Sequence, residues 1–219
     1  MFGMTALSWR RKCVALLGLC FTLLAAQSQA QPVDIIPSSV DSRLVQGADA
    51  GELLFQLRIH STGDFGGILS TVTATIRYDA SSGASLGLGA SFCNSWSAFT
   101  PSPVVVDNGT AYRTYNGFGL NRLEDAVDDG GCGVTLVPEE WFTITTIPVQ
   151  GSGCTSFILG DDAWTNGSNS DLYISMDGVD VTGPVIGGAV NGGDCAIDCL
   201  GVPGGSATIG SSCDDGDPN

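Results

Sequence analysis

Five carboxylate and amide side chains lie in the segment GDDAWTNGSNSD and could together bind a metal ion. They are Asp161, Asp162, Asn166, Asn169 and Asp171. In proteins Ca²⁺ takes about six to eight oxygen ligands from carboxylates, amides and backbone carbonyls. The spacing predicts a structural calcium loop, to which Asp177 and Asp180 of the nearby MDGVD segment could add ligands. The alternative is a polar turn that exposes its acids to water.

The same segment contains Trp164, the tryptophan that a polar loop is most able to expose. Exposed planar aromatic rings can stack on sugar rings, whereas most tryptophans of β-sandwiches belong to the core. Trp164 is therefore the predicted ligand-binding residue, with a glycan as the ligand. Trp96 and Trp141, the other tryptophans beyond residue 30, carry no such signal.

Catalytic groups are sparse. His60 is the only histidine, and Ser85 lies in GASLG, which matches the G-x-S-x-G nucleophile pattern. That pattern needs a strand-to-helix turn and a partner histidine and acid, and no helix is predicted after Ser85. Glu139 and Glu140 are adjacent, so in a strand they would point to opposite faces rather than act as a glycosidase pair. We predict that the chain is not an enzyme.

The N-terminal pattern predicts export. Residues 1–30 have three cations (Arg10, Arg11, Lys12), a short apolar run and the small residues Ser28 and Ala30, which is the pattern of a signal peptide. The run is shorter than the roughly 20 residues of a membrane span, and Leu19 is too bulky for the position before a lipidated cysteine. The sequence therefore predicts a secreted or cell-surface protein, exported by a bacterium, with no transmembrane segment in the mature chain.

Six cysteines follow the predicted cleavage site, and in an exported chain they are expected to form disulfides. The candidates are Cys93, Cys132, Cys154, Cys195, Cys199 and Cys213. No zinc-ligand spacing is present, and the pairing stays open.

The mature chain is strongly acidic. Five arginines stand against twenty-three acids beyond residue 30, a net charge of −18. Nucleic acids and anionic membranes would be repelled by such a surface, so neither is a predicted partner.

Alternating apolar and polar residues predict strands, as in LFQLRIH and STVTATIRYD, where Phe55, Leu57 and Ile59 would share one face. Asn108-Gly109 and Asp177-Gly178 predict tight hairpin turns. One helix of two or three turns is predicted in LNRLEDAVDDGG, with Leu120, Leu123 and Val127 on one face. Short strands and frequent turns predict an all-β fold, an antiparallel two-sheet β-sandwich. The expected boundaries are a lead-in over 31–50, the sandwich over 51–190 and a Gly/Cys-rich segment over 191–219.

Several segments resemble a cohesin-like, immunoglobulin-like β-sandwich module of large secreted bacterial surface proteins. The resemblance covers most of residues 45–219. It rests on FQLRI, GDFGGILSTVTATIRYDASSGASLG, GFGLNRL, WFTITTIPV and DAWTNGSNSDLYISMDGVDVTG. It implies a jelly-roll-like sandwich between a disordered signal peptide and an irregular tail. No residue of the cohesins' dockerin-binding surface can be matched, so that surface is not transferred.

The tail GVPGGSATIGSSCDDGDPN resembles the start of a cysteine-rich CDDGDP-type segment. It lacks the D-x-D-x-D-G spacing of an EF-hand loop, and we expect it to be a truncation that continues into further domains. The predicted function is a non-enzymatic structural or adhesive module that binds a protein or glycan at the cell surface. The alternative is a carbohydrate-binding accessory module of an extracellular hydrolase, and a stand-alone hydrolase is the least favoured.

Overall fold

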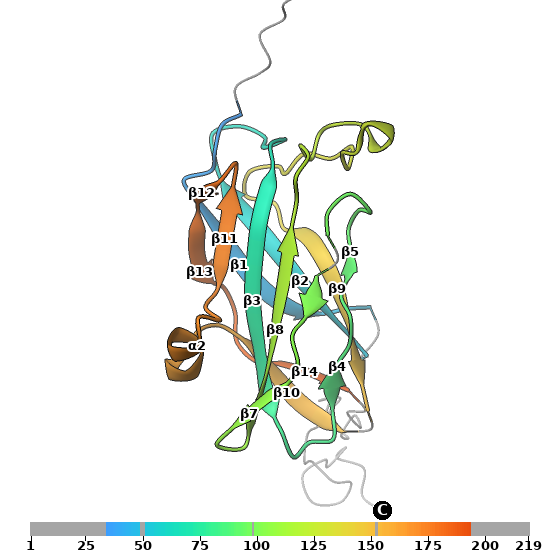
Figure 1. Cartoon of the computed structure of the whole chain (residues 1–219), viewed down its shortest axis with the longest axis vertical. Coiled ribbons are helices and arrows are strands. Elements are labelled where there is room, and N and C mark those ends of the chain that lie inside the picture. The colour runs from blue at the N-terminus through green and yellow to red at the C-terminus, as the bar shows by residue number, and fades with distance from the viewer. Residues whose placement is uncertain (1–33, 49–50, 98, 152, 194–219) are drawn as a thin grey trace, which may run out of the picture. The chain divides into compact units, whose positions relative to one another are not determined.

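The computed structural model describes residues 34–48, 51–97, 99–151 and 153–193, which form two β-sheets (Figure 1). The described residues do not include the predicted signal peptide. They also do not include the tail beyond residue 193, which contains Cys195, Cys199 and Cys213. Within the described part of the chain, no helix is long and apolar enough to cross a membrane.

The first sheet has six strands in the order β13-β1-β2-β9-β4, and β5 also pairs with β9. Its strands are β1 (Ser39–Gln46), β2 (Glu52–His60), β4 (Ser85–Leu86), β5 (Ala90–Ser91), β9 (Phe142–Gln150) and β13 (Thr182–Val185). Every pair is antiparallel except β1 with β13, which is parallel. β1 falls in the segment expected to be a lead-in, and its continuous pairing with β2 makes it part of this sheet.

The second sheet has eight strands and is centred on β3, which pairs with β8 along one edge and with β10 and β11 along the other. Its strands are β3 (Leu69–Asp79), β6 (Thr100–Pro101), β7 (Val105–Asp107), β8 (Thr110–Phe118), β10 (Cys154–Leu159), β11 (Tyr173–Met176), β12 (Val179–Asp180) and β14 (Val190–Gly193). β6 and β7 pair with β8, β12 with β11, and β14 with β10.

Side-chain alternation explains why these segments form strands. In β2 every second residue is buried, and Phe55, Leu57 and Ile59 share the inner face as predicted. The two predicted hairpin turns are also confirmed. Asn108 and Gly109 have φ of 47° and 82°, and Asp177 and Gly178 have φ of 48° and 77°, the left-handed conformations that a tight hairpin turn requires.

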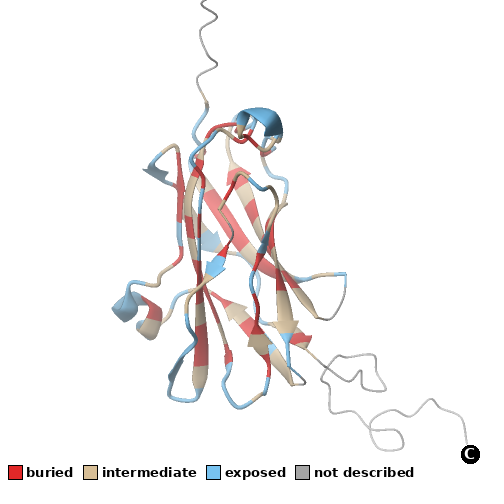
Figure 2. Cartoon of the chain, turned by 45° about the vertical axis from the view of Figure 1, so that its right-hand side comes forward, coloured by how far each residue is buried: buried red, intermediate tan, exposed pale blue. Residues whose placement is uncertain are grey.

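The two sheets pack face to face around one apolar core, which makes the fold a β-sandwich, as predicted (Figure 2). Phe99 lies between the sheets and stacks on Phe55 of β2 and Tyr115 of β8, with ring centroids 5.5 and 5.2 Å apart. The Tyr115 hydroxyl donates to the Gly87 carbonyl at 2.7 Å, so this buried tyrosine has a hydrogen-bond partner.

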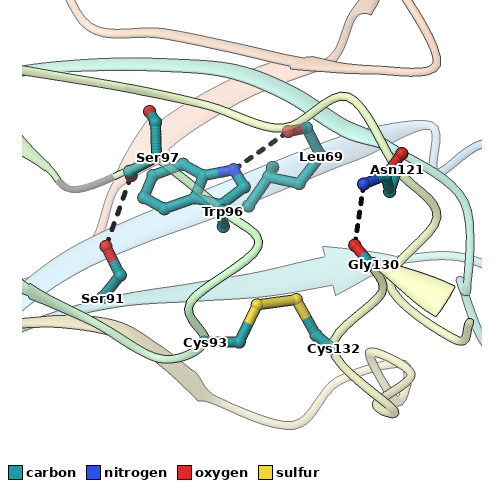
Figure 3. Close-up of a disulfide and its surroundings, with 8 residues drawn as sticks. All are labelled: Leu69, Ser91, Cys93, Trp96, Ser97, Asn121, Gly130 and Cys132. Atoms are coloured by element: carbon teal, nitrogen blue, oxygen red, sulfur yellow. Dashed lines mark hydrogen bonds between the residues drawn. A yellow bond between two sulfur atoms is a disulfide. The ribbon is translucent and has the colours of Figure 1, made fainter. Parts of the chain in front are cut away.

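A disulfide closes one end of the core. Cys93 and Cys132 are bonded, and they connect the loop before Trp96 to the long segment between β8 and β9 (Figure 3). Trp96 is buried, and its indole N–H donates to the Leu69 carbonyl at 3.1 Å. A Cβ on Gly117 would lie 2.1 Å from the Trp96 ring, so only glycine fits there. Cys154 is disulfide-bonded as well.

The helix predicted in residues 120–129 is wrong. That segment is irregular apart from the short 3₁₀ helix η2 (Val127–Asp129). Leu123 is buried, but Leu120 and Val127 are 76% and 62% exposed, so the three side chains do not share one buried face. A one-turn α-helix, α2 (Ala163–Ser168), instead forms in the segment expected to be a loop.

Candidate functional site

The outer face of the eight-stranded sheet carries a row of hydroxyl and amide side chains on β3 and β8. Thr73 donates to the Asn116 side-chain oxygen at 2.9 Å, and the Thr75 and Thr114 hydroxyls lie 2.9 Å apart. These four residues form cross-strand pairs in the register of β3 and β8. The middle of this face is therefore uncharged and rich in hydrogen-bonding groups.

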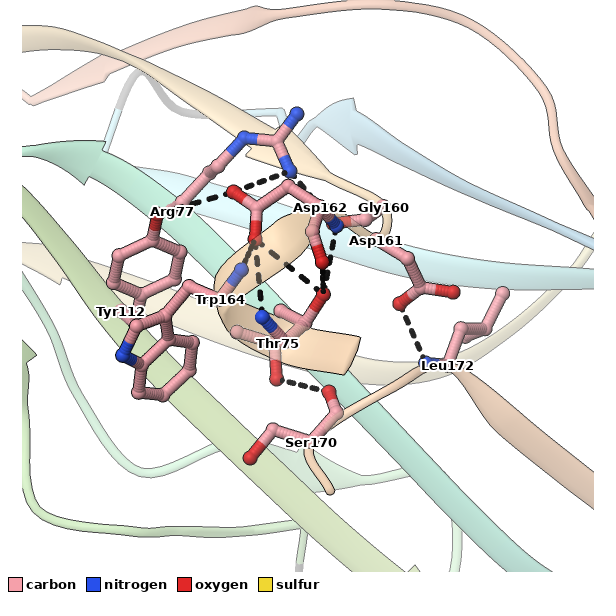
Figure 4. Close-up of polar contacts among 10 residues, drawn as sticks. Thr75, Arg77, Tyr112, Gly160, Asp161, Asp162, Trp164, Ser170 and Leu172 are labelled. Carbon is pink, nitrogen blue, oxygen red and sulfur yellow. Dashed lines mark hydrogen bonds and ion pairs between the residues drawn. The ribbon is translucent and has the colours of Figure 1, made fainter. Parts of the chain in front are cut away.

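Helix α2 lies beside this row, and Asp162 fixes where the helix begins (Figure 4). The Asp162 side chain accepts from the backbone N–H groups of Trp164 and Thr165 at 2.9 and 3.0 Å. The Thr165 hydroxyl lies 2.7 Å from the Asp162 backbone nitrogen and accepts its hydrogen bond, which completes a capping box. Such a reciprocal cap stabilises a helix too short to form by propensity alone.

Trp164 stacks on Tyr112 of β8, with ring centroids 4.2 Å apart and an angle of 22° between the rings. The Tyr112 hydroxyl donates to Asp162 Oδ2 at 3.0 Å, and an Arg77 amino group lies 3.4 Å from the same oxygen. Arg77 also donates to the Gly160 carbonyl at 2.8 Å. Asp162 therefore holds α2, Tyr112 and Arg77 together, and Trp164 is fixed as a half-buried aromatic platform.

The pKa values of these groups follow from their contacts. Burial acts to raise the pKa of Asp162, but hydrogen bonds from Thr165, Tyr112 and Trp164 and the charge of Arg77 outweigh it and lower the pKa. The pKa of Tyr112 is raised by burial and by its donation to the Asp162 carboxylate. Both groups therefore keep at neutral pH the protonation states that their shared hydrogen bond needs.

Beside Trp164 the surface is hollowed into a groove of about 490 Å³, here called the Trp164 groove. No charged side chain lines it. Its lining residues are Thr73, Ser102, Pro103, Val105, Thr114, Asn116, Trp164, Ser168, Asn169 and Ser170. A second hollow of about 400 Å³ adjoins it, because Thr73 and Asn169 line both, and contains Asp171, Leu172 and Tyr173. Together the two hollows extend along the sheet from one aromatic side chain, Trp164, to another, Tyr173.

Some residues of the predicted calcium loop are already used in hydrogen bonds within the chain. Asp161 accepts from the Leu172 backbone N–H at 2.8 Å, and Asp162 caps α2. Asn169 ends that helix in the left-handed conformation, and Asn166 is exposed. Among the described residues, no three His, Cys, Asp or Glu side chains gather to hold a metal ion. One Asp171 oxygen is buried without a hydrogen-bond partner, and the calcium loop stays a prediction.

The groups that could have formed a hydrolase site lie apart. Ser85 of β4 pairs with Gln150, whereas His60 ends β2 beyond the pairing of Leu57 with Phe142. The two are therefore separated by the length of β9, roughly 25 Å at about 3.3 Å per residue. The His60 ring instead contacts Asp41 at 3.0 Å and Glu139 at 2.7 Å. These residues do not form a Ser-His catalytic pair.

Sequence patterns missed the residues that position Trp164. Tyr112 and Arg77 belong to predicted strands, and period-two alternation places both on the outer face with Thr75 and Thr114. The sequence could therefore indicate that Tyr112 and Arg77 share this face. Only the register of β3 with β8 shows that both lie next to α2.

Comparison with known proteins gives a likeness of structure only. No family model matches the chain, and no curated protein matches its sequence. A type I cohesin–dockerin complex from Clostridium thermocellum contains a chain with 9% identity and a TM-score of 0.36, with 74% of this chain and 97% of that one covered. The seventh ScaB type I cohesin of Pseudobacteroides cellulosolvens has 14% identity and a TM-score of 0.34, with 72% and 94% covered.

A type II cohesin from Acetivibrio cellulolyticus, in a cohesin–X-dockerin complex, has 11% identity and a TM-score of 0.35, with 69% of this chain and 97% of that chain covered. These structures are cohesin modules, the class that the quoted segments resemble. At such identities no binding residue of the cohesins carries over to this chain.

Proposed function

We propose that this chain is a non-catalytic module of an exported protein and that it binds a neutral glycan in the Trp164 groove. The observation that carries the proposal is the groove itself: an aromatic ring in fixed orientation beside a lining of hydroxyl and amide groups without charge. An aromatic plane can stack on the apolar face of a sugar ring, and hydroxyl and amide groups can pair with sugar hydroxyls. The site needs no catalytic group to act in this way.

Export is part of the proposal. The signal-peptide pattern over residues 1–30 supports it, and so does the Cys93–Cys132 disulfide, since such bonds persist in oxidising compartments. Such a module would serve either adhesion at a cell surface or the attachment of an extracellular hydrolase to its polysaccharide.

The fixed orientation of Trp164 favours tight binding because little side-chain entropy is lost on contact. Trp164 is stacked on Tyr112, and Tyr112 is hydrogen-bonded to Asp162 before any ligand arrives. Rigid groups lose less freedom on binding than mobile ones do, so preorganisation raises affinity.

A glycan array of neutral oligosaccharides tests the proposal, with the disulfide-bonded protein as probe. Trp164→Ala should lower the affinity for the bound glycan at least about tenfold, and Trp164→Phe should lower it less because a smaller ring remains. Val127→Ala is a matched control, since it removes an exposed apolar side chain on a segment that does not line the groove. Unchanged melting temperatures would show that the variants fold.

Three outcomes would contradict the proposal. If no neutral glycan binds, or if Trp164→Ala binds glycan as the wild type does, the groove is not a glycan site. If a protein partner is found whose binding is lost in Trp164→Ala, the same face would be a protein-docking surface, and the adhesive function would rest on protein rather than sugar.

A further inference from the structure

The outer face of the six-stranded sheet has a cluster of a different kind, here called the Arg43 face: Arg43, Gln56, Arg58, Trp141 and Thr143. Arg43 and Gln56 are paired across β1 and β2, and Trp141 directly precedes β9. The guanidinium carbon of Arg43 lies 4.0 Å from the centroid of the Trp141 ring, and that of Arg58 lies 4.7 Å from it. Two cations thus share one indole ring.

Arg58 and Arg43 differ in whether a carboxylate of the same chain is paired with the guanidinium charge. Arg58 is paired with Asp41 at 2.5 Å, and Asp41 is only 3% exposed. Arg77 is paired with Asp162, and Arg122 with Asp34 and Glu124. Arg43 has no carboxylate within ion-pair distance in the part of the chain that the structure describes. Burial and the neighbouring charge of Arg58 both lower its pKa, in keeping with an excess of positive charge at this point.

The Arg43 side chain is also held in place. Its Nε donates to the Gln56 side-chain oxygen at 2.8 Å, and the Gln56 amide nitrogen donates to the Thr143 hydroxyl at 2.8 Å. With its stacking on Trp141, this chain of contacts fixes the plane of the guanidinium group. The two terminal nitrogens of Arg43 donate no hydrogen bond within the described residues. A guanidinium group fixed in this way can bind a carboxylate through two parallel hydrogen bonds.

We propose that the Arg43 face docks a protein partner, with a partner carboxylate bound by the terminal nitrogens of Arg43. Charge complementarity supports this occupant, because a local positive excess stands on a chain whose mature part has a net charge of −18. The acidic surroundings, among them Glu139 and Glu140, would repel a uniformly acidic partner. They favour one whose carboxylate is flanked by lysine or arginine.

A protein is favoured over an acidic glycan by the composition of the face. Arginine and tryptophan are enriched among the residues that dominate protein–protein binding energy. The three hollows described in the structure are lined by residues of the other sheet and its loops, not by residues of this face. The Trp141 ring already contacts two guanidinium groups, whereas Trp164 stacks on one tyrosine ring beside an open groove.

Selection from a random peptide library displayed on phage tests the proposal, with Arg43→Gln protein used for counter-selection. The expected result is enrichment of peptides that contain Asp or Glu beside Lys or Arg. Their affinity should fall about tenfold for Arg43→Gln, the loss of a bidentate charged pair. Arg43→Lys should also weaken binding, since it keeps the charge but loses the paired geometry. Arg122→Gln removes the same charge away from this face and should bind as the wild type does.

The proposal is overturned if the enriched peptides bind Arg43→Gln as tightly as the wild type, or if Arg122→Gln weakens them equally. It is also overturned if polygalacturonate binds in an Arg43-dependent way while no peptide does, because the ligand would then be an acidic glycan. Trp164→Ala separates this inference from the proposed glycan function: it should leave peptide binding unchanged.

Discussion

The two outer faces of the sandwich each hold a tryptophan, yet they fix it by opposite chemistry. On the eight-stranded sheet Trp164 stacks on a tyrosine, and a carboxylate, Asp162, holds the pair in place. On the six-stranded sheet Trp141 stacks with Arg43 and Arg58. The first arrangement leaves a neutral groove beside its ring, whereas the second places a local positive charge on an acidic protein.

The comparison separates two kinds of charged side chain: those whose charge is paired within the chain, and those whose charge is free to pair with a ligand. Asp162 and Asp41 are both satisfied within the chain, by Tyr112 and α2 in one case and by Arg58 and His60 in the other. Among the described residues, Arg43 and Arg113 have no carboxylate within ion-pair distance, and Arg43 is the one of the two that stacks on Trp141 at the outer face. A contact that is already compensated contributes to stability, and one that is not can contribute to binding.

The largest effect expected from this contrast is on Arg58. Arg58→Gln leaves Asp41 buried with His60 as its only charged partner, and we expect the free energy of unfolding to fall by about 2 kcal/mol. This is below the usual cost of breaking a buried pair because Arg58 is itself 26% exposed. Arg43→Gln removes no ion pair, only the contact with Trp141 and the hydrogen bond to Gln56, and should cost less, about 0.5 to 1 kcal/mol. Urea unfolding of the two variants measures the difference.

The double variant Asp41→Asn/Arg58→Gln is the control, since it removes both charges and should recover part of the loss. Equal losses for Arg58→Gln and Arg43→Gln would contradict the distinction between a compensated and an uncompensated arginine.

A somewhat smaller effect is expected on the other face, at Asp162. Asp162→Ala removes the cap of α2 and the acceptor of Tyr112, and we expect a loss of about 1 to 1.5 kcal/mol, as for other helix caps. The Trp164 ring should become more mobile, which time-resolved fluorescence anisotropy can follow. Asp161→Ala is a matched control, because the neighbouring carboxylate makes one hydrogen bond, to the Leu172 N–H. If Asp161→Ala loosened Trp164 as much, Asp162 would not be the residue that fixes the platform.

Much of the sandwich could be predicted from the sequence, because a strand with one buried face has alternating apolar and polar residues. Phe55, Leu57 and Ile59 alternate with polar residues, and Asn108-Gly109 has the residues that a tight hairpin turn needs. The helix predicted in residues 120–129 is wrong because only one of its three apolar side chains, Leu123, is buried. Leu123 enters the core, and backbone bonds from Leu123 and Glu124 to the Gly67 and Gly66 carbonyls hold the segment instead.

The two sites were harder to predict, because each depends on register between distant strands. Helix α2 contains Gly167 and Asn166, which are poor helix formers, and it forms through the reciprocal cap of Asp162 and Thr165. Trp164 was recognisable as an aromatic residue in a polar segment, but its partner Tyr112 lies 52 positions earlier in the sequence. The Arg43 face was missed altogether, since nothing local connects Arg43 with Trp141.

The single histidine gives a pH test on the six-stranded sheet. Hydrogen bonds with Asp41 and Glu139 raise the pKa of His60 above its ordinary value of 6.5. Its contribution to stability is therefore full below about pH 6.5 and is lost as the pH rises through the raised folded-state pKa. We expect less than about 1 kcal/mol, because the side chain is 33% exposed. Thermal melts from pH 6 to pH 9 should show this decline in the wild type and not in His60→Gln; a parallel decline in both would assign it to other groups.

The smallest expected effect concerns the calcium loop. The buried Asp171 oxygen without a partner is the group that a cation would stabilise most, whereas Asp161 and Asp162 already accept hydrogen bonds. A site with a dissociation constant near 1 mM, common in extracellular modules, would add only about 0.4 kcal/mol at about 1 mM calcium. The melting temperature should therefore rise slightly with calcium, return with chelator, and not respond in Asp171→Asn. If the wild-type melting temperature did not change with calcium up to tens of millimolar, the calcium prediction would be wrong, and Asp171 would only be a polar side chain lining the second hollow.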